Sequence, residues 1–141
     1  NIAYALSAYP AGIVSDRFGR DSLMAIGVTL LIAADLVLAF GATTIWLMVG
    51  TVLWGLHMGL TQGLLATLVA DTAPEDMRGT AFGFFNLISG VAMLIASVVA
   101  GALWDIYGPK MTFLAGAAFT SLALAGLFIV RSCTVELDQG S

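Results

Sequence analysis

The chain contains very little charge. Only 10% of its 141 residues are Asp, Glu, Lys or Arg, whereas 60% are hydrophobic, and the mean hydropathy is +0.99. A soluble domain carries about 25% charged residues. The charged side chains also gather in clusters, and the apolar runs between them are long enough to cross a hydrocarbon layer of about 30 Å as helix. The sequence therefore predicts an all-α, polytopic membrane helix bundle.

Cysteine and histidine are almost absent as well. The single Cys133 excludes an internal disulfide. The single His57 is far from it in sequence, so no cluster of metal ligands is expected. Neither a Ser-His-Asp set nor a catalytic pair of carboxylates is recognisable, and no basic patch suggests nucleic acid. We therefore expect no enzyme, no cofactor, no metal and no nucleic-acid partner.

The apolar runs predict four complete membrane spans and part of a fifth. They cover about 22–40, 45–70, 78–104 and 111–130, with a partial span at 1–14 and a polar tail at 131–141. In the third loop, Thr72, Pro74 and Glu75 fit a capping box with proline in the first turn, which predicts a helix start there. Because Asn1 already stands in apolar helical sequence, we expect a fragment of one transmembrane domain.

The basic residues are distributed unequally between the two ends of the spans. Spans alternate in direction, so Arg17, Arg20, Arg78 and Arg131 fall on one side, and only Lys110 falls on the other. Cytoplasmic loops carry the excess of Lys and Arg. The first loop, the third loop and the tail at 131–141 are therefore expected in the cytoplasm.

A charged motif punctuated by glycine lies between the first two spans and comprises Gly12, Asp16, Arg17, Gly19 and Arg20. It resembles the loop signature of the major facilitator superfamily, Gly-x-Leu-Ala-Asp-Arg-x-Gly-Arg-Lys, although Val14 and Asp21 depart from it. Residues 73–83 resemble the loop that opens the eleventh helix of this family, and 101–105 resemble the end of that helix. The order of these segments resembles the C-terminal half of such a transporter, from the end of the eighth helix through the twelfth.

The resemblance implies a secondary active transporter that moves a small organic solute by alternating access, with proton-coupled drug or metabolite transport as one form. Its partners would be the lipid bilayer, a small-molecule substrate and the missing N-terminal half of the same transporter. The expected location is the bacterial inner (plasma) membrane, with a cytoplasmic C-terminus. The loop motif, together with Arg78, would act in gating, because Arg17 and Arg20 can bind carboxylates or lipid phosphates. The alternative is a capped turn that only sets topology.

The third span carries a polar group of residues. At 100° per residue, Trp54, His57 and Thr61 share one face, which we expect to border the substrate cavity. His57 could contact substrate or carry a proton, or it could bond only to a neighbouring carbonyl. Nearly opposite this face, Gly55, Gly59 and Gly63 form a seam of small residues, which predicts tight packing against another helix. Gln62 lies beside this seam and is expected to make an interhelical hydrogen bond.

The fourth span has a stripe of polar and small side chains within about 60° of Asn86. We call it the Asn86 stripe, and it comprises Gly79, Gly83, Asn86, Ser89, Gly90, Met93, Ser97 and Ala100. The opposite face is apolar and comprises Leu87, Ile88, Val91, Ile95 and Val98. The stripe is expected to touch protein or water, with helix packing at Gly83 and Gly90 and either packing or a cavity contact at Asn86.

Asp35 is the isolated acid of the second span, and we expect it to snorkel outward or pair with a neighbouring helix rather than carry protons. Two other functional classes stay open. One is a small oligomeric membrane protein such as a four-helix multidrug exporter, which needs a carboxylate in its first span, whereas 1–14 has none. The other is a non-transporting relative that serves as a sensor or scaffold.

Overall fold

Every element in the described part of the chain is a helix. The computed structural model describes residue 2 and residues 20–139, and it contains α2 (Arg20–Phe40), α3 (Thr44–Thr72), the 3₁₀ turn η1 (Glu75–Met77), α4 (Arg78–Tyr107) and α5 (Pro109–Gln139). Four segments are long and apolar enough to cross a membrane, namely Ser22–Phe40, Thr44–Thr72, Glu75–Tyr107 and Pro109–Ile129. The predicted all-α membrane helix bundle is confirmed.

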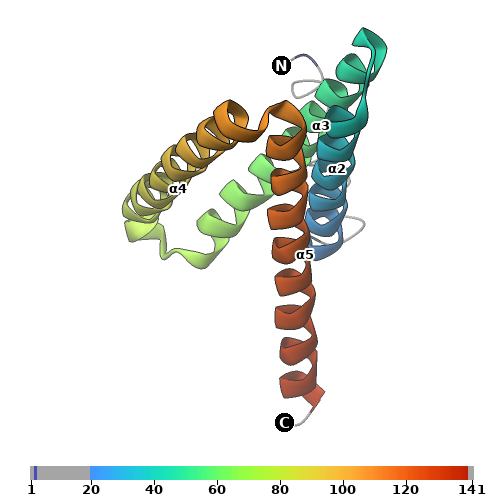
Figure 1. The fold of residues 1–141 in the computed structure, drawn as a ribbon. Coiled ribbons are helices and arrows are strands. Elements are labelled where there is room, and N and C mark those ends of the chain that lie inside the picture. Colours follow the sequence, from blue (N-terminus) through green and yellow to red (C-terminus); the bar gives the residue numbers. More distant parts are fainter. Residues whose placement is uncertain (1, 3–19, 140–141) are drawn as a thin grey trace.

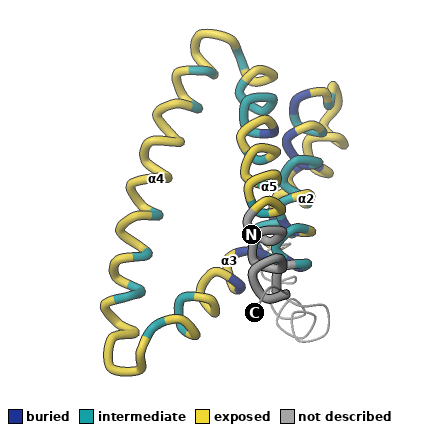
Figure 2. Tube along the Cα trace, turned by 90° about the horizontal axis from the view of Figure 1, so that it is seen from below, coloured by how far each residue is buried: buried dark blue, intermediate teal, exposed yellow. Residues whose placement is uncertain are grey.

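Three of the described long helices, α2, α3 and α5, pack together, and α4 lies largely apart from them. α2 packs along both α3 and α5, whereas α4 leaves α3 at one end and rejoins α5 at the other (Figure 1). Most of α4 therefore lies apart from the other helices, and it contains no buried residue (Figure 2). Within the described part of the chain, the long sides of α4 have no helix packed against them.

Close packing of α2 on α3 depends on two glycines that the sequence did not single out. A Cβ atom added at Gly27 would lie 2.6 Å from Cγ2 of Thr61, and one added at Gly50 would lie 2.6 Å from Cγ of Leu38. Such contacts allow two membrane helices to approach closely. The interface therefore has one tight point near each end of the helix pair.

The predicted glycine seam of α3 is only partly enclosed. Gly55 and Gly59 are buried. Gly63 is exposed, and a Cβ atom added there would meet no described atom within 4 Å. The packing role of this seam stays a prediction.

The turns at one end of the bundle need glycine. The Gly41 N–H donates to the carbonyl of Val37 (2.7 Å), and a Cβ at Gly41 would lie 2.7 Å from Cβ of Trp46. Gly108 joins α4 to α5 with φ 82 and ψ 174, a conformation that is almost restricted to glycine. Lys110 of α5 then places its ammonium 4.7 Å from the centre of the Phe40 ring. These contacts hold the end of α2 beside the start of α5.

At the other end, the predicted capping box is wrong. α3 continues through Thr72, whose hydroxyl donates to the carbonyl of Leu68 (2.6 Å) instead of capping the next helix. A threonine inside a helical turn commonly donates to the carbonyl four residues earlier. Residues 75–77 then form η1, and Arg78 begins α4 while its Nε donates to the carbonyl of Ala70 (3.1 Å).

The helix that contains the last predicted span continues into the polar tail. α5 runs through Gln139 and extends past the other helices (Figure 1). The segment 127–139 contains neither glycine nor proline, so nothing in it interrupts a helix. The candidate membrane span of α5 is Pro109–Ile129, and the cytoplasmic side of 131–141 stays a prediction.

Candidate functional site

Much of the predicted loop motif lies outside the described residues. This applies to Gly12, Asp16, Arg17 and Gly19, and also to the partial span at 1–14. Arg20 begins α2, but its side chain is not described. Of the gating residues only Arg78 can be placed, and it closes the turn between α3 and α4 through the carbonyl of Ala70. An arginine at the C-terminal end of a helix also complements its dipole.

His57 is tied to the neighbouring helix. Its Nδ1 lies 2.8 Å from the carbonyl oxygen of Gly27 on α2, and the ring is half-buried. A carbonyl oxygen can only accept, so Nδ1 carries a proton and donates it in this bond. The other ring nitrogen, Nε2, is left as an acceptor in the neutral ring and is the atom that could meet a solute.

Thr61 and Trp54 have different surroundings, although they share a helix face with His57. Thr61 is 6% exposed and donates its hydroxyl to the carbonyl of His57 (2.9 Å), so its polar group serves the helix itself. Trp54 is exposed and lines a cavity. Gln62 is exposed and has no interhelical hydrogen bond within the described part.

That cavity, which we call the Asp35 cavity, lies among α2, α3, α4 and α5 and has a volume of about 600 Å³. Its wall is mainly aliphatic and aromatic, with Leu31, Trp54, Leu103 and Phe119 among its members. Asp35 is its charged member, and only 8% of this residue is exposed. Outward snorkelling, which we expected for Asp35, is therefore wrong.

Asp35 is accommodated because α5 has a glycine opposite it. Its Oδ2 atom lies 2.8 Å from the position that a Cβ would take on Gly116. Any larger residue at 116 would occupy the space of the carboxylate. The sequence did not reveal this pairing, since Gly116 is 81 positions away and belongs to no glycine motif.

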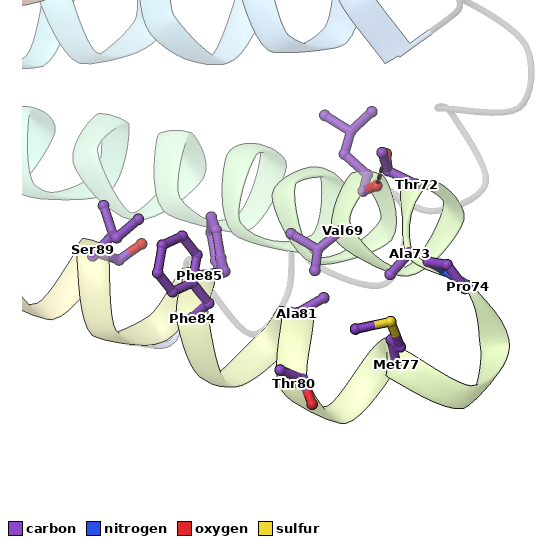
Figure 3. Close-up of a pocket in the computed structure, with 12 residues that line it drawn as sticks. Val69, Thr72, Ala73, Pro74, Met77, Thr80, Ala81, Phe84, Phe85 and Ser89 are labelled. Carbon is purple, nitrogen blue, oxygen red and sulfur yellow. Dashed lines mark hydrogen bonds between the residues drawn. The ribbon is translucent and has the colours of Figure 1, made fainter.

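A second cavity lies in the elbow between α3 and α4 and has a volume of about 750 Å³. Figure 3 shows Val69 of α3 facing Ala81 and Phe85 of α4, with Met77 near the turn. Its lining residues include no charged side chain, and the hydroxyl of Thr72 already donates within α3. Thr80 and Ser89 add two hydroxyl groups to a lining that is otherwise apolar, so this cavity is suited mainly to hydrocarbon.

The Asn86 stripe is divided in the structure: Ser89 lines the second cavity and Ala100 lines the Asp35 cavity, whereas Gly83, Asn86 and Gly90 contact neither. Asn86, Gly83 and Gly90 are exposed, and a Cβ added at either glycine would meet no described atom within 4 Å. The side of α4 that faces the other helices lies roughly a quarter-turn away and carries Phe85, Ala92 and Ala96. Of the predicted cavity residues, only Trp54 lines either of the two cavities, so the roles of His57, Thr61 and Asn86 stay predictions.

The comparison with known proteins identifies the family. The sequence profile of the Major Facilitator Superfamily matches residues 1–137, which is nearly the whole chain. The chain belongs to the major facilitator superfamily. The resemblance drawn from the loop motif and the span order is thereby confirmed, and the family is one of transporters and not of enzymes.

Several transporters of this superfamily are similar over most of the chain. An uncharacterized MFS-type transporter of Methanocaldococcus jannaschii is 36% identical over 92% of this chain and 32% of its own length. The D-xylose transporter of Levilactobacillus brevis is 30% identical over 96% of this chain and 30% of its own length. The lysosomal dipeptide transporter of Bos taurus is 27% identical, with 93% of this chain and 29% of that protein covered. No solved structure matches the chain.

The chain therefore spans about a third of the length of these relatives. Within the described residues, no group of three His, Cys, Asp or Glu side chains could hold a metal ion. The functional geometry of this segment consists of the Asp35 cavity, the His57 contact with α2 and the exposed part of the Asn86 stripe.

Proposed function

We propose that this chain is the C-terminal part of a secondary transporter that moves a small organic solute by alternating access. The observation that carries the proposal is the exposed part of the Asn86 stripe, at Gly83, Asn86 and Gly90, which lies on a membrane-length helix and contacts neither of the two cavities. Polar and small side chains inside a membrane need protein or water beside them. The missing N-terminal half of the transporter would supply that partner, and the solute would lie between the two halves.

The residues proposed to face the solute are Trp54, His57 and Asn86, whereas Thr61 is buried against Gly27 of α2. His57 would use Nε2, because Nδ1 is already engaged with Gly27. The three side chains are formally neutral or weakly basic, so they favour a neutral or amphipathic solute over a strongly anionic one. Among the relatives, one is named for D-xylose, an uncharged sugar, and one for dipeptides, so both are named for small organic solutes.

The proposed orientation places Arg78 and the C-terminus in the cytoplasm of the bacterial inner membrane. Arg78 and Lys110 lie at opposite ends of α4, as alternating spans require. By the alternation of spans, the loop motif at 12–20 would lie on the same side as Arg78 and would close the cytoplasmic entrance together with it.

The test is solute flux into proteoliposomes that contain the full-length protein. Suitable probes are D-xylose, a neutral dipeptide and the dianion succinate. We expect saturable uptake of at least one uncharged or zwitterionic probe and none of succinate. Asn86→Leu should reduce the uptake, whereas the matched control Leu87→Ala, on the opposite face, should not.

Two results would contradict the proposal. If the folded full-length protein produced no solute-dependent flux for any probe, the sensor or scaffold alternative would replace it. If a protein of four or five spans transported as an oligomer, the alternative of a small oligomeric membrane protein would be correct.

A further inference from the structure

Asp35 is a buried residue whose carboxylate borders the cavity and has no protein partner among the described residues. It is 8% exposed and makes no hydrogen bond or ion pair within the described part of the chain. Lys110, at the same end of the helices, places its ammonium over the Phe40 ring and not on Asp35. Burying a charged group is costly unless it is paired, and an ionisable side chain inside a membrane marks a functional position by default.

The surroundings of Asp35 form a space of ligand size. The Asp35 cavity measures about 600 Å³, within the range of about 300–1,000 Å³ that is usual for small-molecule sites. Two aromatic residues, Trp54 and Phe119, contribute to its wall, and Thr120 adds a hydroxyl. Aromatic faces attract organic cations, and an apolar wall accepts their hydrocarbon groups.

We propose that the Asp35 cavity is a binding site for a hydrophobic organic cation, whose positive charge pairs with Asp35 and whose apolar groups pack against Trp54 and Phe119. Gly116 is part of the site because the absence of its side chain leaves room for the carboxylate. The cavity opens among four helices of this chain and shares Trp54 with the proposed solute site, whereas Asp35, Gly116 and Phe119 belong to the cavity alone. The proposal concerns binding, and it can therefore fail or hold independently of the proposed transport.

Equilibrium binding of tritiated tetraphenylphosphonium to the full-length protein in an uncharged maltoside detergent tests the proposal. This probe is a permanent hydrophobic cation, and the detergent supplies neither an amine nor an anion that could compete. We expect saturable binding to the wild type. Asp35→Asn, which keeps the shape but removes the charge, should weaken it about tenfold or more. The matched control Asp105→Asn removes an exposed acid at the end of α4 and should leave the affinity unchanged.

A second measurement on the wild-type protein guards against a folding defect of the variant. The hydrophobic reagent dicyclohexylcarbodiimide labels buried carboxyl groups, and mass spectrometry of the peptide that contains Asp35 reports the labelling. Tetraphenylphosphonium should protect Asp35 from this label. Wild-type affinity in Asp35→Asn, absence of saturable binding to the wild type, or labelling that the cation does not reduce would each overturn the proposal and make Asp35 a neutral packing residue.

Discussion

The Nδ1 atom of His57 lies 2.8 Å from the carbonyl oxygen of Gly27, so a side chain of α3 donates a hydrogen bond to the backbone of α2. This bond orients the imidazole ring and fixes its proton on Nδ1. A bond of this kind between membrane helices contributes about 0.6 kcal/mol on average and up to about 1.7 kcal/mol. It also leaves Nε2 available, so a structural and a solute-binding role can coexist in one residue.

Two substitutions at His57 should separate these roles. In His57→Asn the amide nitrogen can replace Nδ1, so we expect the thermal unfolding midpoint of the full-length protein to stay near the wild-type value. Solute uptake should nevertheless fall, because Asn has no counterpart of Nε2. His57→Leu removes both ring nitrogens, so it should lower the unfolding midpoint and the solute uptake. Wild-type uptake by His57→Asn would restrict the residue to helix packing.

The contact of Gly27 with Thr61 predicts a substitution and its rescue. Gly27→Ala places a methyl group 2.6 Å from Cγ2 of Thr61, and such overpacking typically costs about 1–3 kcal/mol. Adding Thr61→Ser removes Cγ2 and keeps the hydroxyl that donates to His57, so most of the lost stability should return. Thermal unfolding of the single and double variants measures both effects.

Gly63→Ala is the matched control for this cycle, because nothing described lies within 4 Å of the added methyl group. It should not reduce stability through a contact with α2. An equal loss in Gly27→Ala and Gly63→Ala, or a double variant no more stable than Gly27→Ala, would contradict the proposed contact.

The turn between α4 and α5 should be sensitive to any side chain at position 108. Gly108 has φ 82 and ψ 174, and other residues pay about 1–3 kcal/mol in this region. We expect Gly108→Ala to lower the unfolding midpoint clearly, whereas Gly101→Ala, within α4 and facing open space, should not. Similar unfolding midpoints for Gly108→Ala and Gly101→Ala would show that the turn accommodates a side chain without loss of stability.

The helical spans could be predicted from composition, because crossing a membrane demands about 20 apolar residues whatever the tertiary contacts are. The family followed from the local motif at 12–20 and the order of the later segments. The capping box predicted from the third loop is wrong, because the hydroxyl of Thr72 donates to a carbonyl of its own helix, α3. A capping motif does not specify which of two adjacent helices will use the hydroxyl.

The contacts between helices could not be predicted. Gly116 makes room for Asp35, and Gly27 approaches Thr61, although neither pair is close in sequence. Helical periodicity places Trp54, His57 and Thr61 on one side of α3 but does not say which neighbour each will meet. Trp54 lines a cavity, His57 bonds to the backbone of α2, and Thr61 bonds to a carbonyl of its own helix.

The most direct test of the account is a cysteine scan of α4 in the full-length protein, carried out in a Cys133→Ser background with a membrane-impermeant maleimide added from each side. Alternating access predicts that cysteines at Gly83, Asn86 and Gly90 react, and that the transported solute shifts their reactivity from one side to the other. Cysteines at Leu87, Val91 and Val98 should react from neither side. Reactivity of the stripe that the solute does not change, or labelling of the apolar face instead, would contradict the central claim.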